Sequence, residues 1–150
     1  MAAGDTIRIL LSTLPRSPFG APLSLVIGGW PRILRDGEDV AADAATVEGT
    51  ISRNAEARHP RTAIGFSRDS TTLFLLTVDG RSERSVGATL VELAALMRRL
   101  GAWQAMNFDG GGSTTMVARM HPHARRLALR THTADRAERA VPLGFGIFRR

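Results

Sequence analysis

The sequence predicts a single α+β domain in which a mostly antiparallel or mixed β-sheet packs with one or two helices. Two β-prone runs, residues 62–67 and 72–78, flank a short polar turn, a pattern typical of a β-hairpin. Residues 88–100 then carry the apolar spacing of an amphipathic helix. With 150 residues, 43% of them apolar, the chain can bury one core of ordinary size but not two.

The N-terminal third predicts less regular structure than the rest. Residues 1–22 contain several proline and glycine breakers and are expected to be irregular, so the folded domain is placed at residues 23–150. Its first strand is expected at residues 23–27, a short apolar run. Residues 30–40 indicate a strand that ends in an Asp-Gly turn. A polar, alanine-rich loop with some helix follows.

The hairpin and the helix after it are the clearest local signals. A second turn, Asp79-Gly80, is expected where the hairpin ends. Thr89 can cap the helix, and Glu92 three residues later completes a capping box. Gly101 suits the left-handed conformation just past a helix end. The apolar side chains expected on the buried face are Leu90, Leu93, Ala94, Met97 and Leu100.

Four segments after the helix indicate further strands. They are residues 103–108, 114–119, 125–130 and 141–148. A run of three glycines separates the first two of these segments, so a sharp turn is expected there. Strands before and after a single long helix are what an α+β arrangement requires.

Composition excludes several classes of chemistry. The chain has no cysteine, hence no disulfide, thiolate metal site or cysteine nucleophile. All twenty basic residues are arginines, so Schiff-base and P-loop lysine chemistry are excluded too. His121 and His123 have no nearby carboxylate, and no metal and no cofactor are expected. No run is long enough to span a membrane, and residues 1–11 do not resemble a signal peptide.

The net charge of +6 allows two interpretations. Arginine in place of lysine is typical of a genome rich in G and C, and it would also suit a surface for phosphate or carboxylate partners. The arginines are scattered along the chain and form no long run, which favours the first interpretation. Aromatic residues are only 5%, and no nucleic-acid motif is present, so nucleic-acid binding is not expected.

The glycine run is the strongest candidate for a ligand site. Asp109 precedes Gly110, Gly111 and Gly112, and Ser113, Thr114 and Thr115 follow. Glycines let a backbone approach a ligand closely, and consecutive N–H groups in such a turn can hold an anion. A glycine-rich hairpin turn is the alternative, but two glycines would suffice for that. The spacing matches neither a Walker loop nor a dinucleotide-binding fingerprint.

A second concentration of charge lies just before the hairpin. Arg58, His59 and Arg61 stand at the start of its first strand. An arginine there could clamp a phosphodiester through two parallel hydrogen bonds. A solvated strand start is an equally good interpretation of these residues taken alone. His59 could donate a proton, although a lone histidine at a strand start more often has a simple structural role.

Taken together, the two stretches resemble the phosphodiester glycosidase family. The resemblance rests on "RHPRTAIGFSRDSTTLFLLTVDGR" and on the capped helix that ends in "LMRRLGAWQAMNFDGGGSTTMV". It also includes "GGWPRILRDG" and "DRAERAVPLGFGIF", and so runs from about Ile27 to Phe148. Residues 23–150 are therefore identified as the C-terminal portion of such a domain. Many bacterial members of this family have unassigned roles in envelope or exopolysaccharide metabolism.

The resemblance implies hydrolysis of a sugar-1-phosphodiester at the glycosidic C–O bond. This reaction needs a charge clamp on the phosphate and a carboxylate near the anomeric carbon. The expected catalytic residues are Asp109 and Arg61, although Asp109 could instead cap a turn. A second carboxylate could be Glu48 or Asp79, although Asp79 is more often a turn residue, or it could lie in the half of the family domain that is expected to be missing. The expected substrate-binding residues are Thr62, Gly110, Gly111, Gly112, Ser113, Thr114 and Arg139.

Two departures from the family pattern leave an alternative open. The chain has no Asn-Gly-Gly-Phe-Phe-like segment, so the N-terminal half of the family domain is expected to be missing. Thr131 and Thr133 stand where the family tends to have Asn and Pro, although Glu138 and Arg139 are kept. A non-catalytic domain that binds an anion or a glycan is therefore the alternative to a hydrolase.

Two expectations concern assembly and location. A sheet edge left open by a missing half could be covered by a second copy of the chain, which would make a homodimer. Relatives are often exported, whereas this chain shows no export signal, so the sequence leaves the compartment open. The expected partner is a sugar phosphodiester or glycan substrate.

Overall fold

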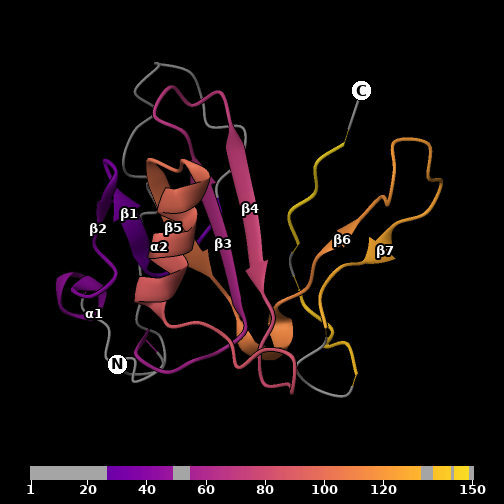
Figure 1. Cartoon of the computed structure of the whole chain (residues 1–150), viewed down its shortest axis with the longest axis horizontal. Coiled ribbons are helices and arrows are strands. Elements are labelled where there is room, and N and C mark those ends of the chain that lie inside the picture. Colours follow the sequence, from indigo (N-terminus) through magenta and orange to yellow (C-terminus); the bar gives the residue numbers. More distant parts are fainter. Residues whose placement is uncertain (1–26, 49–54, 133–136, 143, 149–150) are drawn as a thin grey trace, which may run out of the picture.

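The computed structural model describes residues 27–48, 55–132, 137–142 and 144–148 (Figure 1). A five-stranded sheet with the order β2-β1-β5-β3-β4 forms the body, and helix α2 lies across one of its faces. All strand pairs of this sheet are antiparallel, which confirms the α+β expectation. Its strands are β1 (Arg32–Arg35), β2 (Glu38–Asp39), β3 (Arg61–Phe66), β4 (Leu73–Val78) and β5 (Gln104–Phe108).

The remaining elements are helical or belong to a small second sheet. The helices are α1 (Ala44–Val47), α2 (Leu90–Leu100) and the 3₁₀ turn η2 (Gly111–Ser113), and the second sheet pairs β6 (Val117–Ala118) with β7 (Ala128–Leu129). In Figure 1 this small sheet lies to one side of the five-stranded sheet, beyond β4. The hairpin of β3 and β4 and the helix after it are where the sequence predicts them.

Helix α2 has the ends that its sequence predicts. The Thr89 side chain accepts a hydrogen bond from Glu92 N at 3.1 Å, and Glu92 Oε2 accepts one from Thr89 N at 3.0 Å. Gly101 ends the helix in the left-handed conformation, with φ of 99°. Four of the five predicted apolar residues are buried against the sheet, but Leu100 is 52% exposed. Leu100 is the last residue of the helix, and the helix ends before its side chain can reach the core.

The last three expected strands are shorter than predicted or do not form in the described residues, because a strand extends only as far as a neighbouring strand pairs with it. Residues 114–119 and 125–130 contribute only the two-residue strands β6 and β7, which pair with each other. Among the described residues of 141–148, none is in a strand. The expected turn at Asp79-Gly80 is also wrong, since the chain turns at Glu83 and Arg84, between Ser82 and Ser85. Residues 23–26 of the first expected strand lie outside the described residues.

Strand direction decides where the polar residues gather. Because β3 runs antiparallel to both neighbours, its first residues lie beside the last residues of β4 and β5: Arg61 pairs with Val78, and Thr62 pairs with Phe108. The start of β1 lies at the same end, where Asn107 N donates to Pro31 O at 2.9 Å. We call this end of the sheet, with the loops attached to it, the loop edge.

Candidate functional site

The loop edge brings together the two stretches that the sequence singles out. The glycine run leaves β5 and folds back against Pro60, because Gly111 N donates to Pro60 O at 2.9 Å. A Cβ on Gly110 would lie only 2.6 Å from Pro60 O and 3.8 Å from the Arg61 Cα. Only glycine allows so close an approach of the two backbones. The loop is therefore packed against the start of β3.

Most backbone donors of the loop are already used inside it. Gly110 N donates to the Asp109 side chain, and Gly111 N donates to Pro60 O. Ser113 N and Thr114 N close the η2 turn by donating to Gly110 O and Gly111 O. Four of the five N–H groups from Gly110 to Thr114 thus have partners. The anion nest expected from the glycine run is largely replaced by a self-bonded turn, with the Gly112 N–H as the remaining donor.

Asp109 is exposed at the end of β5. Its Oδ1 accepts a hydrogen bond from Gly110 N at 2.9 Å. Sequence reasoning considered a turn-capping bond to Gly111, and the structure places the bond one residue earlier. A carboxylate has two oxygens and about four acceptor positions, so one such bond leaves Asp109 able to meet water or a ligand. The capping role and a catalytic role are compatible.

Arg61 is placed differently from a surface clamp. It is 6% exposed, its Nε donates to Ala88 O at 2.9 Å, and an Nη donates to Ala57 O at 2.8 Å. Burial lowers the pKa of the guanidinium from its ordinary value, although arginine stays charged. Arg61 therefore ties together two loops beneath the candidate site and supplies a buried positive charge there.

Two of the predicted binding residues touch each other across the edge. The Thr62 hydroxyl donates to the Thr114 hydroxyl at 3.4 Å, and Thr114 is buried. This contact joins β3 to the segment that follows η2. Ser113 is half-buried in η2, and Arg139 is exposed on the C-terminal segment. The structure thus brings Thr62, Thr114 and the glycine run together at the loop edge, with Asp109 bonded to Gly110 and Arg61 next to Pro60 in the chain.

Sequence reasoning missed Arg81, an exposed cation that lies beside the glycine run. An Nη of Arg81 would lie 3.2 Å from a Cβ placed on Gly111, so the guanidinium lies directly beside the loop. The same Nη approaches His59 Nδ1 at 3.2 Å. Arginine can only donate, which makes Nδ1 the acceptor and puts the ring proton of neutral His59 on Nε2. Burial, then Arg61 and Arg81, lower the pKa of His59 below its ordinary value.

Asp79 and His132 form a second polar contact at this edge. Asp79 accepts from His132 N at 3.0 Å and from His132 Nδ1 at 3.1 Å. His132 Nε2 lies 3.0 Å from an Nη of Arg84, so Nε2 accepts and Nδ1 carries the proton. The two residues are 53 positions apart. Sequence reasoning treated Asp79 as a turn residue and gave His132 no role, because no local pattern connects them.

Buried polar groups lie under the end of β5. Asn107 Nδ2 donates to Trp30 O at 2.7 Å. Within the described part of the chain, Asn107 Oδ1, Trp30 Nε1 and His59 Nε2 are buried without a hydrogen-bond partner. Such groups cost about 1–3 kcal/mol each when left unpaired. This concentration of polar cost near one edge is typical of a site under functional constraint.

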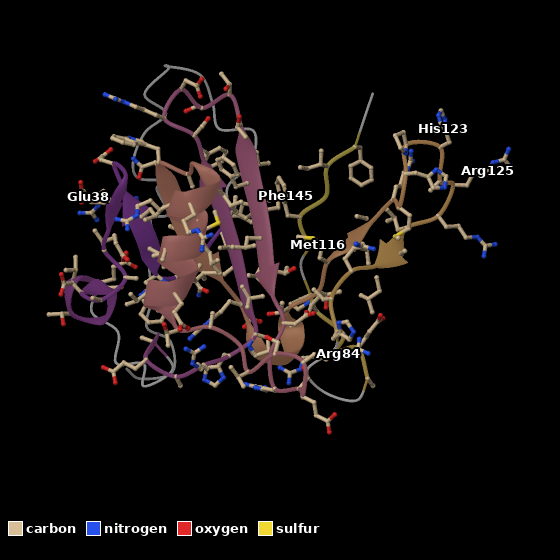
Figure 2. All side chains as sticks on the ribbon, viewed as in Figure 1. Glu38, Arg84, Met116, His123, Arg125 and Phe145 are labelled. Carbon is tan, nitrogen blue, oxygen red and sulfur yellow. The ribbon has the colours of Figure 1, made fainter. Side chains whose placement is uncertain are left out.

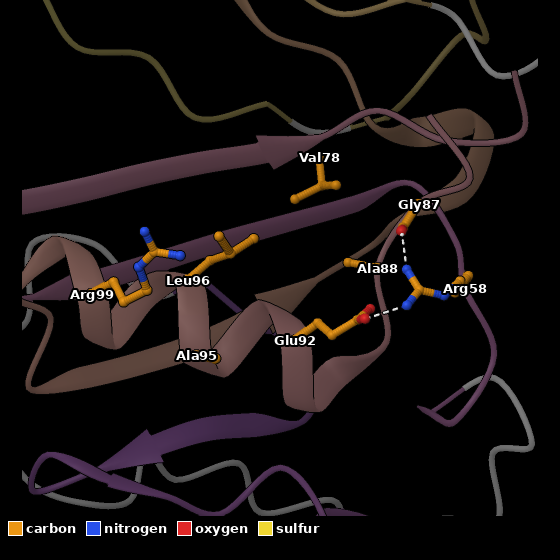
Figure 3. Close-up of a pocket in the computed structure, with 8 residues that line it drawn as sticks. All are labelled: Arg58, Val78, Gly87, Ala88, Glu92, Ala95, Leu96 and Arg99. Carbon is orange, nitrogen blue, oxygen red and sulfur yellow. Dashed lines mark hydrogen bonds and ion pairs between the residues drawn. The ribbon is translucent and has the colours of Figure 1, made fainter. Parts of the chain in front are cut away.

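A hollow of about 360 Å³ opens on the helix side of this edge (Figure 3). Arg58 stands at one end, where it donates to Gly87 O at 3.1 Å and pairs with Glu92. The other residues that line the hollow are Val78, Gly87, Ala88, Ala95, Leu96 and Arg99. The hollow shares Ala88 with the contacts of Arg61. It has an apolar floor and charged ends, and Asp109 does not line it.

Within the described ranges, no three His, Asp or Glu side chains gather in a way that could hold a metal ion. No described helix has the length and hydropathy needed to cross a membrane.

Comparison with known proteins gives consistent matches. The sequence model of the family described as phosphodiester glycosidase matches residues 1–148, and so begins well before Ile27. The chain is 36% identical over 106 residues to the SPbeta prophage-derived uncharacterized protein YomE of Bacillus subtilis (strain 168), covering 71% of this chain and 14% of that protein. It is 33% identical over 110 residues to N-acetylglucosamine-1-phosphodiester alpha-N-acetylglucosaminidase of Mus musculus, covering 69% of this chain and 20% of that enzyme.

A solved structure agrees with these matches. The catalytic domain of the zebrafish N-acetylglucosamine-1-phosphodiester alpha-N-acetylglucosaminidase, described as auto-inhibited by its pro-peptide, matches with a TM-score of 0.52 and 28% identity. The match covers 59% of this chain and 31% of that one. The chain therefore spans a third or less of the length of these relatives.

Proposed function

The chain belongs to the phosphodiester glycosidase family, and we propose that it hydrolyses a sugar-1-phosphodiester to a free sugar and a phosphomonoester. The observation that carries the proposal is the convergence at the loop edge. The exposed carboxylate of Asp109 stands beside a glycine turn that is bonded to Pro60 and that the guanidinium of Arg81 approaches at Gly111.

In the proposed reaction, water supplies a hydroxyl to the anomeric carbon while the bond from that carbon to the phosphate oxygen breaks. The leaving phosphomonoester keeps the bridging oxygen with the electron pair of the broken bond, and the proton that the water gives up goes to the phosphomonoester or to solvent. Because this leaving group is already stable as an anion, cationic groups matter more than a strong general acid. We assign Asp109 to activating the water or stabilising the sugar cation.

The phosphate is assigned to the cations and hydroxyls of the loop edge. Arg81 is exposed beside Gly111 and can contact the phosphate directly. Arg61 contributes its buried charge and positions the edge through its two carbonyl contacts. The Gly112 N–H and the hydroxyls of Ser113 and Thr114 complete the proposed contacts. The proposed substrate-binding residues also include the glycine run, Thr62 and Arg139.

The test is sugar release from a panel of sugar-1-phosphodiesters in water labelled with ¹⁸O. N-acetylglucosamine-1-phosphodiesters come first because the mouse relative is named for them. The panel also includes phosphodiesters of envelope and exopolysaccharide type, the context that we propose for the substrate. Label in the released sugar supports cleavage of the C–O bond. Label in the phosphate would instead make the protein a phosphodiesterase and overturn the proposal.

Two variants locate the chemistry. Asp109→Asn should reduce sugar release by roughly 10²–10⁴-fold, the usual contribution of a positioned acid or base. Asp43→Asn is the matched control, because Asp43 is exposed and its side chain makes no capping bond to α1. Equal activity in the two variants would remove Asp109 from the reaction.

A binding domain without catalysis is the second candidate. Arg81 beside Gly111 would be the main anion contact in that case, since the loop keeps only the Gly112 N–H as a backbone donor. Calorimetry with a sugar phosphate would show binding without turnover in that case. Binding that disappears in Arg81→Gln, together with no sugar release from wild type, would support this second candidate over the hydrolase.

A further inference from the structure

The segment from Thr114 to His132, which we call the arm, differs in charge from the rest of the chain. It contains β6, β7 and the connection between them. It carries four arginines and no acidic residue, and the next acid after Asp109 is Asp135. The arm thus accounts for four of the six net positive charges of the chain. Its arginines are Arg119, Arg125, Arg126 and Arg130.

These arginines are exposed, and none of them pairs with a carboxylate in the described part of the chain. Arg130 donates to Met120 Sδ at 2.9 Å. Figure 2 shows Arg125 and His123 at the outer end of the arm, pointing away from the body. Unneutralised charge of one sign on a projecting segment attracts an extended anionic partner.

The arm also exposes aliphatic side chains beside these charges. Val117 and Leu129 are direct partners across β6 and β7, so they lie on one face of the small sheet. Val117 is 51% exposed, Met120 61%, Leu127 62% and Leu129 40%. Soluble surfaces normally scatter such residues singly, whereas a group of them indicates an interaction surface.

The arm contains no Phe, Tyr or Trp; Phe108 and Phe145 flank it in the sequence. Proteins that bind single-stranded nucleic acids usually stack bases on such large aromatic rings, which the arm lacks. Arginine together with exposed aliphatic groups matches the boundary of an anionic bilayer, where phosphates lie above acyl chains. This combination of charge and apolar area favours a lipid surface over a nucleic acid.

The base of the arm is fastened to the loop edge. Within the arm, Met116 N donates to the Thr131 hydroxyl at 3.2 Å, and Arg130 N donates to Met116 O at 2.8 Å, so its two halves are held together at the base. At the start of the arm, the Thr62 hydroxyl of β3 donates to the Thr114 hydroxyl at 3.4 Å. His132 is held by Asp79 at the end of β4. These contacts fix the two ends of the arm to the sheet while its outer part projects away (Figure 1). Whatever the arm binds is thereby held next to the candidate site.

We propose that the arm docks the protein on an anionic lipid surface. The four arginines meet the headgroup phosphates, and Val117, Met120 and Leu127 enter the boundary between headgroups and acyl chains. This docking is independent of the proposed hydrolysis, because it uses none of Asp109, Arg61 or Arg81.

The experiment is flotation with vesicles, using the full chain. Vesicles of phosphatidylcholine with about a third phosphatidylglycerol are compared with vesicles of phosphatidylcholine alone. Each basic residue near such a surface contributes about 1 kcal/mol, so Arg125→Gln with Arg126→Gln should weaken binding roughly thirtyfold. Leu127→Ser should weaken it severalfold, and added salt should weaken it further.

Matched controls distinguish an effect of the arm from the general effects of lowering the net charge or of removing an exposed leucine. Arg98→Gln with Arg99→Gln removes the same charge from an adjacent exposed pair on α2, and Leu100→Ser removes an exposed leucine there. Both control proteins should bind like wild type. Circular dichroism on every variant checks that the fold is kept.

Three outcomes would overturn the proposal. Wild type could fail to bind the anionic vesicles, or the two arginine pairs could have equal effects. In the third outcome, Leu127→Ser does not change vesicle binding, and soluble polyphosphate competes for the protein as well as the vesicles do. That result would assign the arm to a soluble polyanion.

Discussion

The helix-covered face of the sheet and the loop edge are built by different kinds of interaction. Under α2, buried apolar side chains pack together, among them Ile33, Leu34, Leu93 and Met97. At the loop edge, one or two hydrogen bonds connect each pair of residues far apart in the chain. Thr62 and Thr114 are 52 positions apart, and Asp79 and His132 are 53 apart. Stability thus resides mainly in the first region, and the proposed chemistry in the second.

The largest loss of stability is expected from a substitution in the core under α2. Leu93 is fully buried under the helix, so Leu93→Ala should lower the free energy of unfolding by about 2–5 kcal/mol. Urea denaturation measures it, with Leu100→Ala as the control because Leu100 is exposed. A loss for Leu93→Ala no larger than for Leu100→Ala would mean that α2 does not dock as described.

Gly110→Ala is expected to act on the loop edge with an intermediate effect. Its Cβ would lie 2.6 Å from a backbone oxygen, and such overpacking costs roughly 1–3 kcal/mol. Sugar release should fall more than this cost alone implies, because the loop must move away from Pro60. Gly28→Ala is the control, since nothing lies within 4 Å of its Cβ position. Unchanged thermal stability and activity in Gly110→Ala would contradict the close packing of loop and strand.

Asp79→Asn should loosen the arm with little effect on the core. The amide keeps one acceptor oxygen and turns a donor toward His132, so one of the two bonds is lost, at about 1 kcal/mol. Hydrogen exchange should rise in residues 114–132 while α2 keeps its protection. Exchange that rises equally in both regions would show that the arm and the core unfold as one unit.

The smallest expected effect is a change of thermal stability with pH. Burial lowers the pKa of His59 in the folded protein, so the folded state favours the neutral ring that accepts from Arg81. The stabilising contribution is present above the unfolded value of about 6.5 and is lost as pH falls below it. Thermal unfolding between pH 7.5 and 5.5 should show a smaller decrease in His59→Gln than in wild type. An identical decrease would exclude His59 as the group responsible.

Sequence patterns predicted the elements whose signals are local. Thr89, Glu92 and Gly101 mark the ends of α2 within a few residues, and the hairpin shows in two runs of β-prone residues separated by a turn. The glycine run was predicted as a loop whose backbone comes close to a ligand; in the structure it comes close to the Pro60 backbone, and contact with a ligand stays a prediction. The resemblance to the family followed from the same contiguous stretches and is confirmed by the family match.

The sequence failed where the outcome depends on distant partners. Residues 141–148 have strand-like composition but form no strand in their described part, because a strand needs a neighbour to pair with. Arg61 was expected to clamp a phosphate at the start of a strand, and no local pattern indicated that the carbonyls of Ala57 and Ala88 hold it in a buried position. From the sequence, Asp79 was expected to be a turn residue; only the fold places His132 beside it, where Asp79 accepts two hydrogen bonds.

The sequence by itself therefore determined the helix, the hairpin, the glycine loop and the family, because each is encoded by neighbours within a few positions of the chain. Only the tertiary structure decided that Arg61 is buried, that Arg81 lies beside the loop, and that a basic arm is fastened through Asp79 and His132. The physical reason is distance along the chain: a hydrogen bond between residues some fifty positions apart leaves no periodicity in either segment. It exists only once the antiparallel sheet has brought the strand ends to one edge.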